Sequence, residues 1–148
     1  FIENIARYLG VTIDEVGPLS VASESPEKPS GICAVLAETD VINMVSRGIA
    51  RPDILKGIHL SMADRLARLL RSAGIHGVVV LTGGLAKDIG LRRALEDLIA
   101  KDKRIACDIV THPDSVYAGA IGAALWGAVR HRRLERLAPQ APSSVASA

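Results

Sequence analysis

Apolar residues recur every three or four positions along much of the chain, which is the spacing of amphipathic helices. Helices are therefore predicted over residues 1–9, 12–17, 39–49, 51–73, 88–99 and 115–131. Short aliphatic runs without this spacing predict three strands, at residues 32–36, 77–81 and 105–110. Strands that alternate with helices are typical of parallel sheets covered by helices, so the pattern predicts a layered α/β fold.

Residues with capping chemistry mark where several of these helices begin. Thr12 and Glu15 have the spacing of a capping box. Pro52 suits the first turn of the longest helix, because an amide hydrogen is not needed there. Asp88 can cap the helix that follows it, and either residue of Thr39-Asp40 can cap the helix after the first predicted strand. The side chains of that helix expected to face inward are Val41, Ile42, Val45 and Ile49.

Two segments are too polar or too irregular to form a core. Gly17-Pro18 is predicted to end the second helix, and residues 20–30, which carry two prolines, are predicted to form an exposed connector. The segment 134–148 is rich in Pro, Ser and Ala and is predicted to be disordered. Residues 1–133 are therefore predicted to be the folded part of the chain.

The segment 77–86 is the centre of the predicted fold. Residues 78–81 are consecutive large aliphatic side chains, so this strand is expected to be buried on both faces. Gly83 and Gly84 follow at once and let the backbone bend sharply and another group approach it closely. At the carboxyl end of a parallel strand that group is often a nucleotide. A tight turn without a ligand is the simpler interpretation, and Lys87 suits either a contact with an adenine ring or a solvated position.

The last predicted helix is unusually rich in small residues. Its glycines, Gly119, Gly122 and Gly127, each cost a helix about 1 kcal/mol. Close approach of another backbone or of a ligand would explain them, so we expect this face to pack tightly near the Gly-Gly turn.

Composition and charge narrow the possible functions. The 148 residues are 49% hydrophobic but only 3% aromatic, which indicates an aliphatic core. A net charge of +2 is too balanced to indicate nucleic acid or a membrane as a partner. Two cysteines and no signal peptide indicate a cytoplasmic setting. The chain opens at Phe1 within a helical pattern, from which we expect a fragment that lacks its amino-terminal part.

Three motifs occur in the order and spacing of a known superfamily. Leu81-Thr82-Gly83-Gly84-Leu85-Ala86 resembles the adenosine motif of the acetate-kinase/sugar-kinase/heat-shock/actin superfamily, and residues 118–124 resemble its small-residue hinge helix. Residues 31–42 are similar to a segment with a cluster-ligating cysteine in the ATPases that activate 2-hydroxyacyl-CoA dehydratases and benzoyl-CoA reductases. The resemblance is greatest to the ATP-binding subunits of benzoyl-CoA reductases. It implies that residues 1–133 are the C-terminal part of a ribonuclease H-like ATPase fold.

This resemblance implies an ATP-driven electron donor. In the family, two ATPase subunits share one [4Fe-4S] cluster, to which each gives two cysteines, and Cys33 matches the second of them. The implied partners are a second ATPase subunit, in a homo- or heterodimer, and the subunits that reduce an acyl-CoA. ATP or ADP with Mg²⁺ is the implied nucleotide. The residues expected to hold its adenosine part are Thr82, Gly83, Gly84, Leu85 and Lys87.

Some family features are expected outside this chain. The first cysteine and the phosphate-binding loops with their aspartates would precede Phe1, so no catalytic residue is assigned here. Without the resemblance, Cys33 is better interpreted as a small buried hydrophobic residue, and Cys107 is assigned to the core. The four histidines lack metal-ligand spacing and are expected at the surface or at helix caps.

Three alternative functions remain open, of which the first is another that the resemblance implies. The chain could belong to an activator of a 2-hydroxyacyl-CoA dehydratase. It could belong to a small-molecule kinase of the sugar-kinase type, which would use the same Gly-Gly turn but would not need Cys33. It could also be a dimerisation module without catalytic activity.

Overall fold

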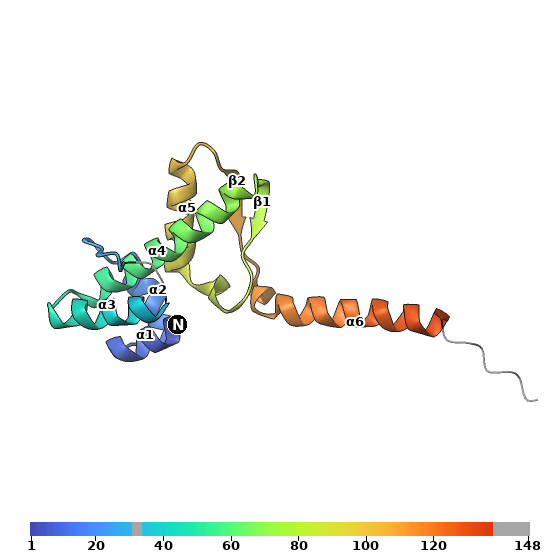
Figure 1. Ribbon diagram of the computed structural model, residues 1–148, viewed down its shortest axis with the longest axis horizontal. Helices are drawn as coiled ribbons and strands as arrows, with labels where there is room; N and C mark the ends of the chain where they lie inside the picture. The colour runs from blue at the N-terminus through green and yellow to red at the C-terminus, as the bar shows by residue number, and fades with distance from the viewer. Residues whose placement is uncertain (31–33, 138–148) are drawn as a thin grey trace, which may run out of the picture.

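The computed structural model describes residues 1–30 and 34–137 and has a mixed helical and sheet architecture (Figure 1). Its elements in chain order are α1 (Ile2–Leu9), α2 (Ile13–Val21), α3 (Ala34–Ser46), α4 (Arg51–Ser72), β1 (His76–Val80), the 3-10 helix η1 (Gly84–Lys87), α5 (Ile89–Lys101), β2 (Ala106–Val110), the 3-10 helix η2 (Pro113–Tyr117) and α6 (Ala118–Leu137).

The predicted helix starts at residues 12, 52 and 88 are confirmed. Thr12 and Glu15 form the capping box, in which Glu15 Oε2 accepts from the Thr12 amide and hydroxyl, both at 2.7 Å. Pro52 lies in the first turn of α4. Asp88 caps α5 by accepting from the amides of Gly90 and Leu91. These caps satisfy amide groups that the first turn of a helix leaves without an intrahelical partner.

The long helix α4 contributes to both hydrophobic clusters of the molecule. One cluster joins α1, α2 and α3 to the first half of α4, and the other joins the second half of α4 to α5 and β2. Fully buried members include Ile5, Val16, Val41 and Leu55 in the first cluster and Ala63, Ala94 and Leu95 in the second. No helix within residues 1–30 and 34–137 has the length and apolar character needed to cross a membrane.

The strands β1 and β2 pair in parallel, as predicted, with Val79 opposite Ile109. One face packs on the second cluster through Ile109 and Cys107. On the other face Val78 is 64% exposed and Val80 is 56% exposed. The prediction that β1 is buried on both faces is therefore wrong. The helix α6 extends away from the sheet and does not cover its exposed face (Figure 1).

The glycines of α6 have no packing partner among the described residues. A Cβ added at Gly119, Gly122 or Gly127 would meet nothing within 4 Å, and no residue of α6 is buried. The expected tight packing of this face is therefore wrong for residues 1–30 and 34–137. The helix also continues to Leu137, so the first residues of the segment predicted to be disordered are helical.

The predicted strand at 32–36 is wrong where the structure describes it. Residues 34–36 begin α3, while Ile32 and Cys33 lie outside the described residues. Thr39-Asp40 consequently lies inside the helix and does not cap it. A short apolar run does not by itself distinguish a buried strand from a helix, and here a helical stripe packs on the first cluster.

The stripe that α3 buries differs from the predicted one. Ala37, Val41 and Met44 are buried, at the i, i+4 and i+7 positions of one helix face. Ile42 and Val45, which were expected to face inward, are 52% and 48% exposed. The helix starts five residues earlier than predicted, but this does not change which side chains share a face. The face that is buried is therefore decided by the neighbouring helices, α1 and α4.

The predicted connector at 20–30 is only partly exposed. Gly17-Pro18 does not end α2, which runs to Val21 and buries Ser20. Asp53 of α4 accepts from the Ser23 hydroxyl at 2.7 Å. A Cβ added at Gly57 of α4 would overlap the Glu27 carbonyl oxygen, so the two backbones are in close contact. The connector is therefore held against α4 by polar contacts that its composition does not reveal.

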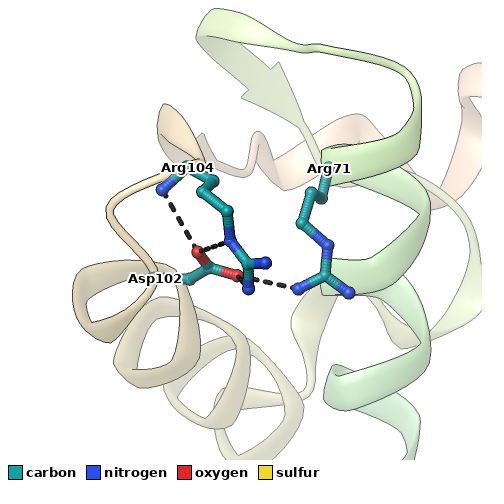
Figure 2. Close-up of polar contacts among 3 residues, drawn as sticks. All are labelled: Arg71, Asp102 and Arg104. Atoms are coloured by element: carbon teal, nitrogen blue, oxygen red, sulfur yellow. Dashed lines mark hydrogen bonds and ion pairs between the residues drawn. The ribbon is translucent and has the colours of Figure 1, made fainter.

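A cluster of three charged residues joins the ends of α4 and α5 (Figure 2). Asp102 accepts from Arg104 Nε at 2.8 Å, from the Arg104 amide at 3.1 Å and from Arg71 Nη1 at 2.9 Å. The Arg104 side chain and amide, followed by Arg71, hold the pKa of Asp102 well below its ordinary value. The carboxylate thereby links the last turn of α4 to the turn that leads into β2.

We expect Asp102→Asn to lower the melting temperature of the full-length protein at pH 7. A carboxyl pKa depressed by folding stabilises the native state above the unfolded pKa, and this contribution disappears as pH falls through the folded pKa. The difference in melting temperature between the variant and the wild type should therefore become smaller below pH 3.8, the ordinary pKa of an aspartate. Thermal unfolding measured between pH 2 and 7 checks this.

Asp97→Asn is the matched control, since it removes the same charge from an exposed position of α5 that has no ion pair among the described residues. If Asp102→Asn lowers the melting temperature by the same amount at every pH, the charge of Asp102 is not what stabilises the contact between α4 and the turn before β2.

Candidate functional site

The loop between β1 and α5 is held at both ends by backbone hydrogen bonds. The Gly83 amide donates to the Ser115 carbonyl of η2 at 2.9 Å, and the Asp88 amide donates to the Leu85 carbonyl at 3.1 Å. Gly83 has φ +93° and ψ −172°, a backbone conformation that side chains with a Cβ rarely adopt. The turn predicted from the two glycines therefore exists, and Gly83 is the residue that makes it possible.

Two of the cavities beside this loop are lined in part by Leu85. The smaller one, which we call the loop cavity, has a volume of about 200 Å³ and lies between η1 and α2. Its lining includes Gly84, Leu85 and Lys87 from the predicted site. The larger one, the α4 cavity, has a volume of about 430 Å³ and is lined by Thr82 and Leu85 together with α4. Gly83 lines neither cavity.

The loop cavity combines an apolar lining with three charged residues, of which two are acidic and one is basic. Its remaining lining residues are Ile13, Asp14, Gly17, Pro18, Asp88 and Ile89. A Cβ added at Gly84 would meet nothing within 4 Å, so the space beside this glycine is open. Asp14 offers hydrogen-bond acceptors and Lys87 offers donors. Such a cavity suits a ligand with an apolar planar body and polar edges.

The sequence did not indicate that α2 forms one wall of the cavity. Asp14 and Pro18 belong to a helix whose only recognisable feature was its capping box, and Pro18 was predicted to end that helix. Their place beside Gly84 follows from the packing of α2 on α4 and α5. No local pattern in the sequence would have identified them.

The α4 cavity is larger and more apolar. Its lining from α4 includes Ser61, Arg65 and Arg68 together with aliphatic side chains. It is also lined by Phe1, the first residue of the chain. Thr82 faces this cavity, so the five predicted adenosine-binding residues do not all line one space.

A buried polar group lies behind the loop cavity. His59 of α4 is 1% exposed and Ser20 of α2 is 0% exposed. His59 Nδ1 lies 2.8 Å from Ser20 Oγ, and His59 Nε2 lies 3.2 Å from Asp88 Oδ2. His59 Nε2 and Asp88 Oδ2 are close enough for an ion pair, but they are not aligned for a strong hydrogen bond. The expectation that every histidine lies at the surface or at a cap is therefore wrong for His59, whereas His112 does cap η2.

Asp88 has opposing influences on its pKa. Burial raises the pKa of Asp88, but the contact with His59 and the amides of Leu91 and Gly90 lower it, and the net result lies below the ordinary value. Asp88 is therefore ionised at neutral pH although its side chain is only 8% exposed. A buried carboxylate in this state needs the partners that surround it.

The predicted iron–sulfur ligand, Cys33, lies outside the described ranges. Cys107 is half-buried in β2, and residues 1–30 and 34–137 contain no group of three His, Cys, Asp or Glu side chains that could hold a metal. A [4Fe-4S] cluster is bound by four thiolates, and the sequence has two cysteines. The donor set fits such a cluster only if further thiolates come from other segments or subunits.

Comparison with known proteins decides the family. The profile of the BadF/BadG/BcrA/BcrD ATPase family matches residues 1–127. This chain belongs to that family. One benzoyl-CoA reductase subunit from Thauera aromatica is 62% identical over 141 residues, which are 95% of this chain and 50% of that protein. The activator of lactoyl-CoA dehydratase from Anaerotignum propionicum is 37% identical over 85% of this chain and 46% of its own length.

A solved structure agrees with the sequence matches. The activator of 2-hydroxyisocaproyl-CoA dehydratase from Clostridium difficile, with bound ADPNP, superimposes with a TM-score of 0.75 at 29% identity, covering 95% of this chain and 50% of that one. The fold prediction is confirmed: the chain has the α/β fold of ATPases of the actin and sugar-kinase type. The chain spans about half the length of the curated relatives that it matches.

Proposed function

We propose that the chain is part of an ATP-hydrolysing electron-transfer subunit, which drives the reduction of an aromatic acyl-CoA by a partner subunit. The observation that carries this proposal is the 62% identity to the benzoyl-CoA reductase subunit from Thauera aromatica along 95% of the chain. Activation of a 2-hydroxyacyl-CoA dehydratase is the second candidate. It is favoured less, because the activators of such enzymes are 37% identical over a smaller share of the chain.

We infer that the adenosine part of ATP or ADP binds in the loop cavity, against Gly84, Leu85 and Lys87. The open space beside Gly84 and the apolar wall formed by α2 support this position. Gly83 would act by setting the turn, and Thr82 by lining the opposite side of the loop. The triphosphate and Mg²⁺ would be held by parts of the full-length protein outside this chain.

Cys33 would contribute one thiolate to a [4Fe-4S] cluster shared with a second ATPase subunit. A symmetric or pseudosymmetric dimer is a direct way to collect four thiolates when each subunit supplies two. When bound, such a cluster supplies a carrier for single electrons at low potential. The role of this chain would be to hold that carrier through Cys33 and to hold the nucleotide through the loop cavity.

We expect Lys87→Ala in the full-length protein to weaken ADP binding by about three- to tenfold, because a charge-assisted contact at the cavity rim is lost. Lys101→Ala removes the same charge from the exposed far end of α5 and should leave the affinity unchanged. Isothermal titration with ADP measures both. Equal affinities for the wild type and both variants would mean that Lys87 is solvated and takes no part in the site.

A reconstituted system tests the function as a whole. The full-length protein, loaded with iron and sulfide under anaerobic conditions, should support ATP-dependent reduction of benzoyl-CoA by its acyl-CoA-reducing partner. Activation of a 2-hydroxyacyl-CoA dehydratase without that reduction would favour the second candidate. ATP-dependent phosphorylation of a small molecule, with no bound iron, would overturn both in favour of a kinase.

A further inference from the structure

We propose that His59 is a positioning residue for the nucleotide, which acts through Asp88 to keep the loop cavity in its binding shape. This inference rests on the proposed nucleotide site. His59 does not line the loop cavity itself. It lies behind the cavity, 3.2 Å from an oxygen of Asp88, which does line it.

Asp88 is the residue through which a change at His59 would reach the ligand. Its backbone amide closes η1 by donating to the Leu85 carbonyl at 3.1 Å. Its Oδ1 accepts from the Gly90 and Leu91 amides at 2.8 and 3.1 Å, which fixes the start of α5. Its Oδ2 faces His59. One carboxylate therefore couples the loop that borders the cavity, the helix that follows it and a side chain of α4.

The hydrogen-bonding roles in this group follow from the ionised state of Asp88. A carboxylate only accepts hydrogen bonds, so the tautomer with the hydrogen on His59 Nε2 is the one that suits the contact with Asp88. In that tautomer Nδ1 is an acceptor, and the Ser20 hydroxyl, 2.8 Å away, donates to it. Ser20 on α2 thereby fixes the ring orientation in which His59 faces Asp88.

The same three residue types form the catalytic triad of serine hydrolases, but the geometry here excludes that role. Ser20 is 0% exposed, so no substrate reaches its hydroxyl. The serine also contacts Nδ1 and the aspartate contacts Nε2, the reverse of the usual triad order. The arrangement suits support of a neighbouring site and not nucleophilic attack.

Two helical glycines allow the three helices to converge on this group. A Cβ added at Gly90 would lie 2.5 Å from His59 Nδ1 and 2.9 Å from Ser20 Oγ. A Cβ added at Gly17 would lie 3.0 Å from Asp88 Oδ1. Glycine lowers the stability of a helix by about 1 kcal/mol relative to alanine. Both glycines stand where an alanine would push α2 or α5 away from the buried polar group.

Two substitutions of His59 each keep one of its two contacts and remove the other. The amide of asparagine matches Nδ1 in reach, so His59→Asn keeps the Ser20 contact and leaves Asp88 Oδ2 without a partner. The amide nitrogen of glutamine matches Nε2 in reach, so His59→Gln keeps a donor for Asp88 and loses the Ser20 contact. Ser20→Ala breaks the Ser20 contact from the other side and is the matched control for His59→Gln.

The experiment measures ADP dissociation constants and melting temperatures of the full-length proteins. We expect His59→Asn to weaken ADP binding about tenfold, while His59→Gln and Ser20→Ala stay within about threefold of the wild type, since only the first leaves the carboxylate unpaired. Melting temperatures should fall in all three variants. Restored affinity in His59→Gln at lowered stability is a result that a purely structural role would not produce.

Two outcomes would overturn the inference. ADP affinity that falls equally in His59→Asn and His59→Gln, or that follows the melting temperature in all variants, would make His59 a packing residue only. Unchanged affinity in His59→Asn, with the protein folded, would do the same. Failure of the wild-type protein to bind ADP would instead reject the proposed nucleotide site itself, so the two failures are distinguishable.

Discussion

Substitution of Gly84 by valine is expected to abolish measurable ATP binding to the full-length protein, a loss of about a hundredfold or more, because the added side chain would occupy the volume of the ligand. Without nucleotide, a Cβ at this position would meet nothing within 4 Å. The valine side chain therefore clashes with no part of the protein, and the variant should still fold. Calorimetric titration with ATP and a thermal melt of the same sample measure the two effects separately.

Two further variants make this test specific. Gly84→Ala adds only a Cβ and should weaken ATP binding less than valine does. Gly83→Ala should lower the melting temperature even without nucleotide, because Gly83 has φ +93°, where a Cβ is strained. Unchanged ATP affinity in Gly84→Val would remove the adenosine from this cavity and leave the Gly-Gly pair as a structural turn.

The second large effect is expected for Cys33→Ser. Cluster ligation requires a thiolate, whereas packing requires only a small and weakly polar side chain. The full-length protein with this substitution, reconstituted anaerobically, should lose its iron–sulfur absorbance and bound iron but keep its fold and its ATP binding. Electron transfer to the acyl-CoA-reducing partner should be lost with the iron.

Cys107→Ser is the matched control for the Cys33 experiment. Cys107 is half-buried in β2 opposite Gly77, where serine fits with little change in volume. This variant should keep its full iron and sulfide content. If Cys33→Ser retains them as well, Cys33 is a core residue and the redox proposal fails, which would favour a kinase or a dimerisation module.

The sequence by itself determined those features that depend on neighbouring residues. The capping box at Thr12 and Glu15, the cap at Asp88 and the turn at Gly83 all rest on hydrogen bonds or dihedral angles within a few residues. The parallel pairing of β1 with β2 followed from the alternation of strands and helices. The family, too, could be inferred from short motifs, and the match over residues 1–127 confirms it.

The tertiary structure alone decided which residues are close across the fold. The glycines that permit close approach are Gly17, Gly57 and Gly90, not those of α6. His59 is buried, although nothing beside it in the sequence indicates this. Contacts between residues distant in sequence depend on how whole helices pack, and packing is selected by the combined burial of many side chains. The wall that α2 forms beside Gly84, and the carboxylate that His59 faces, belong to this second class, because no local pattern encodes either contact.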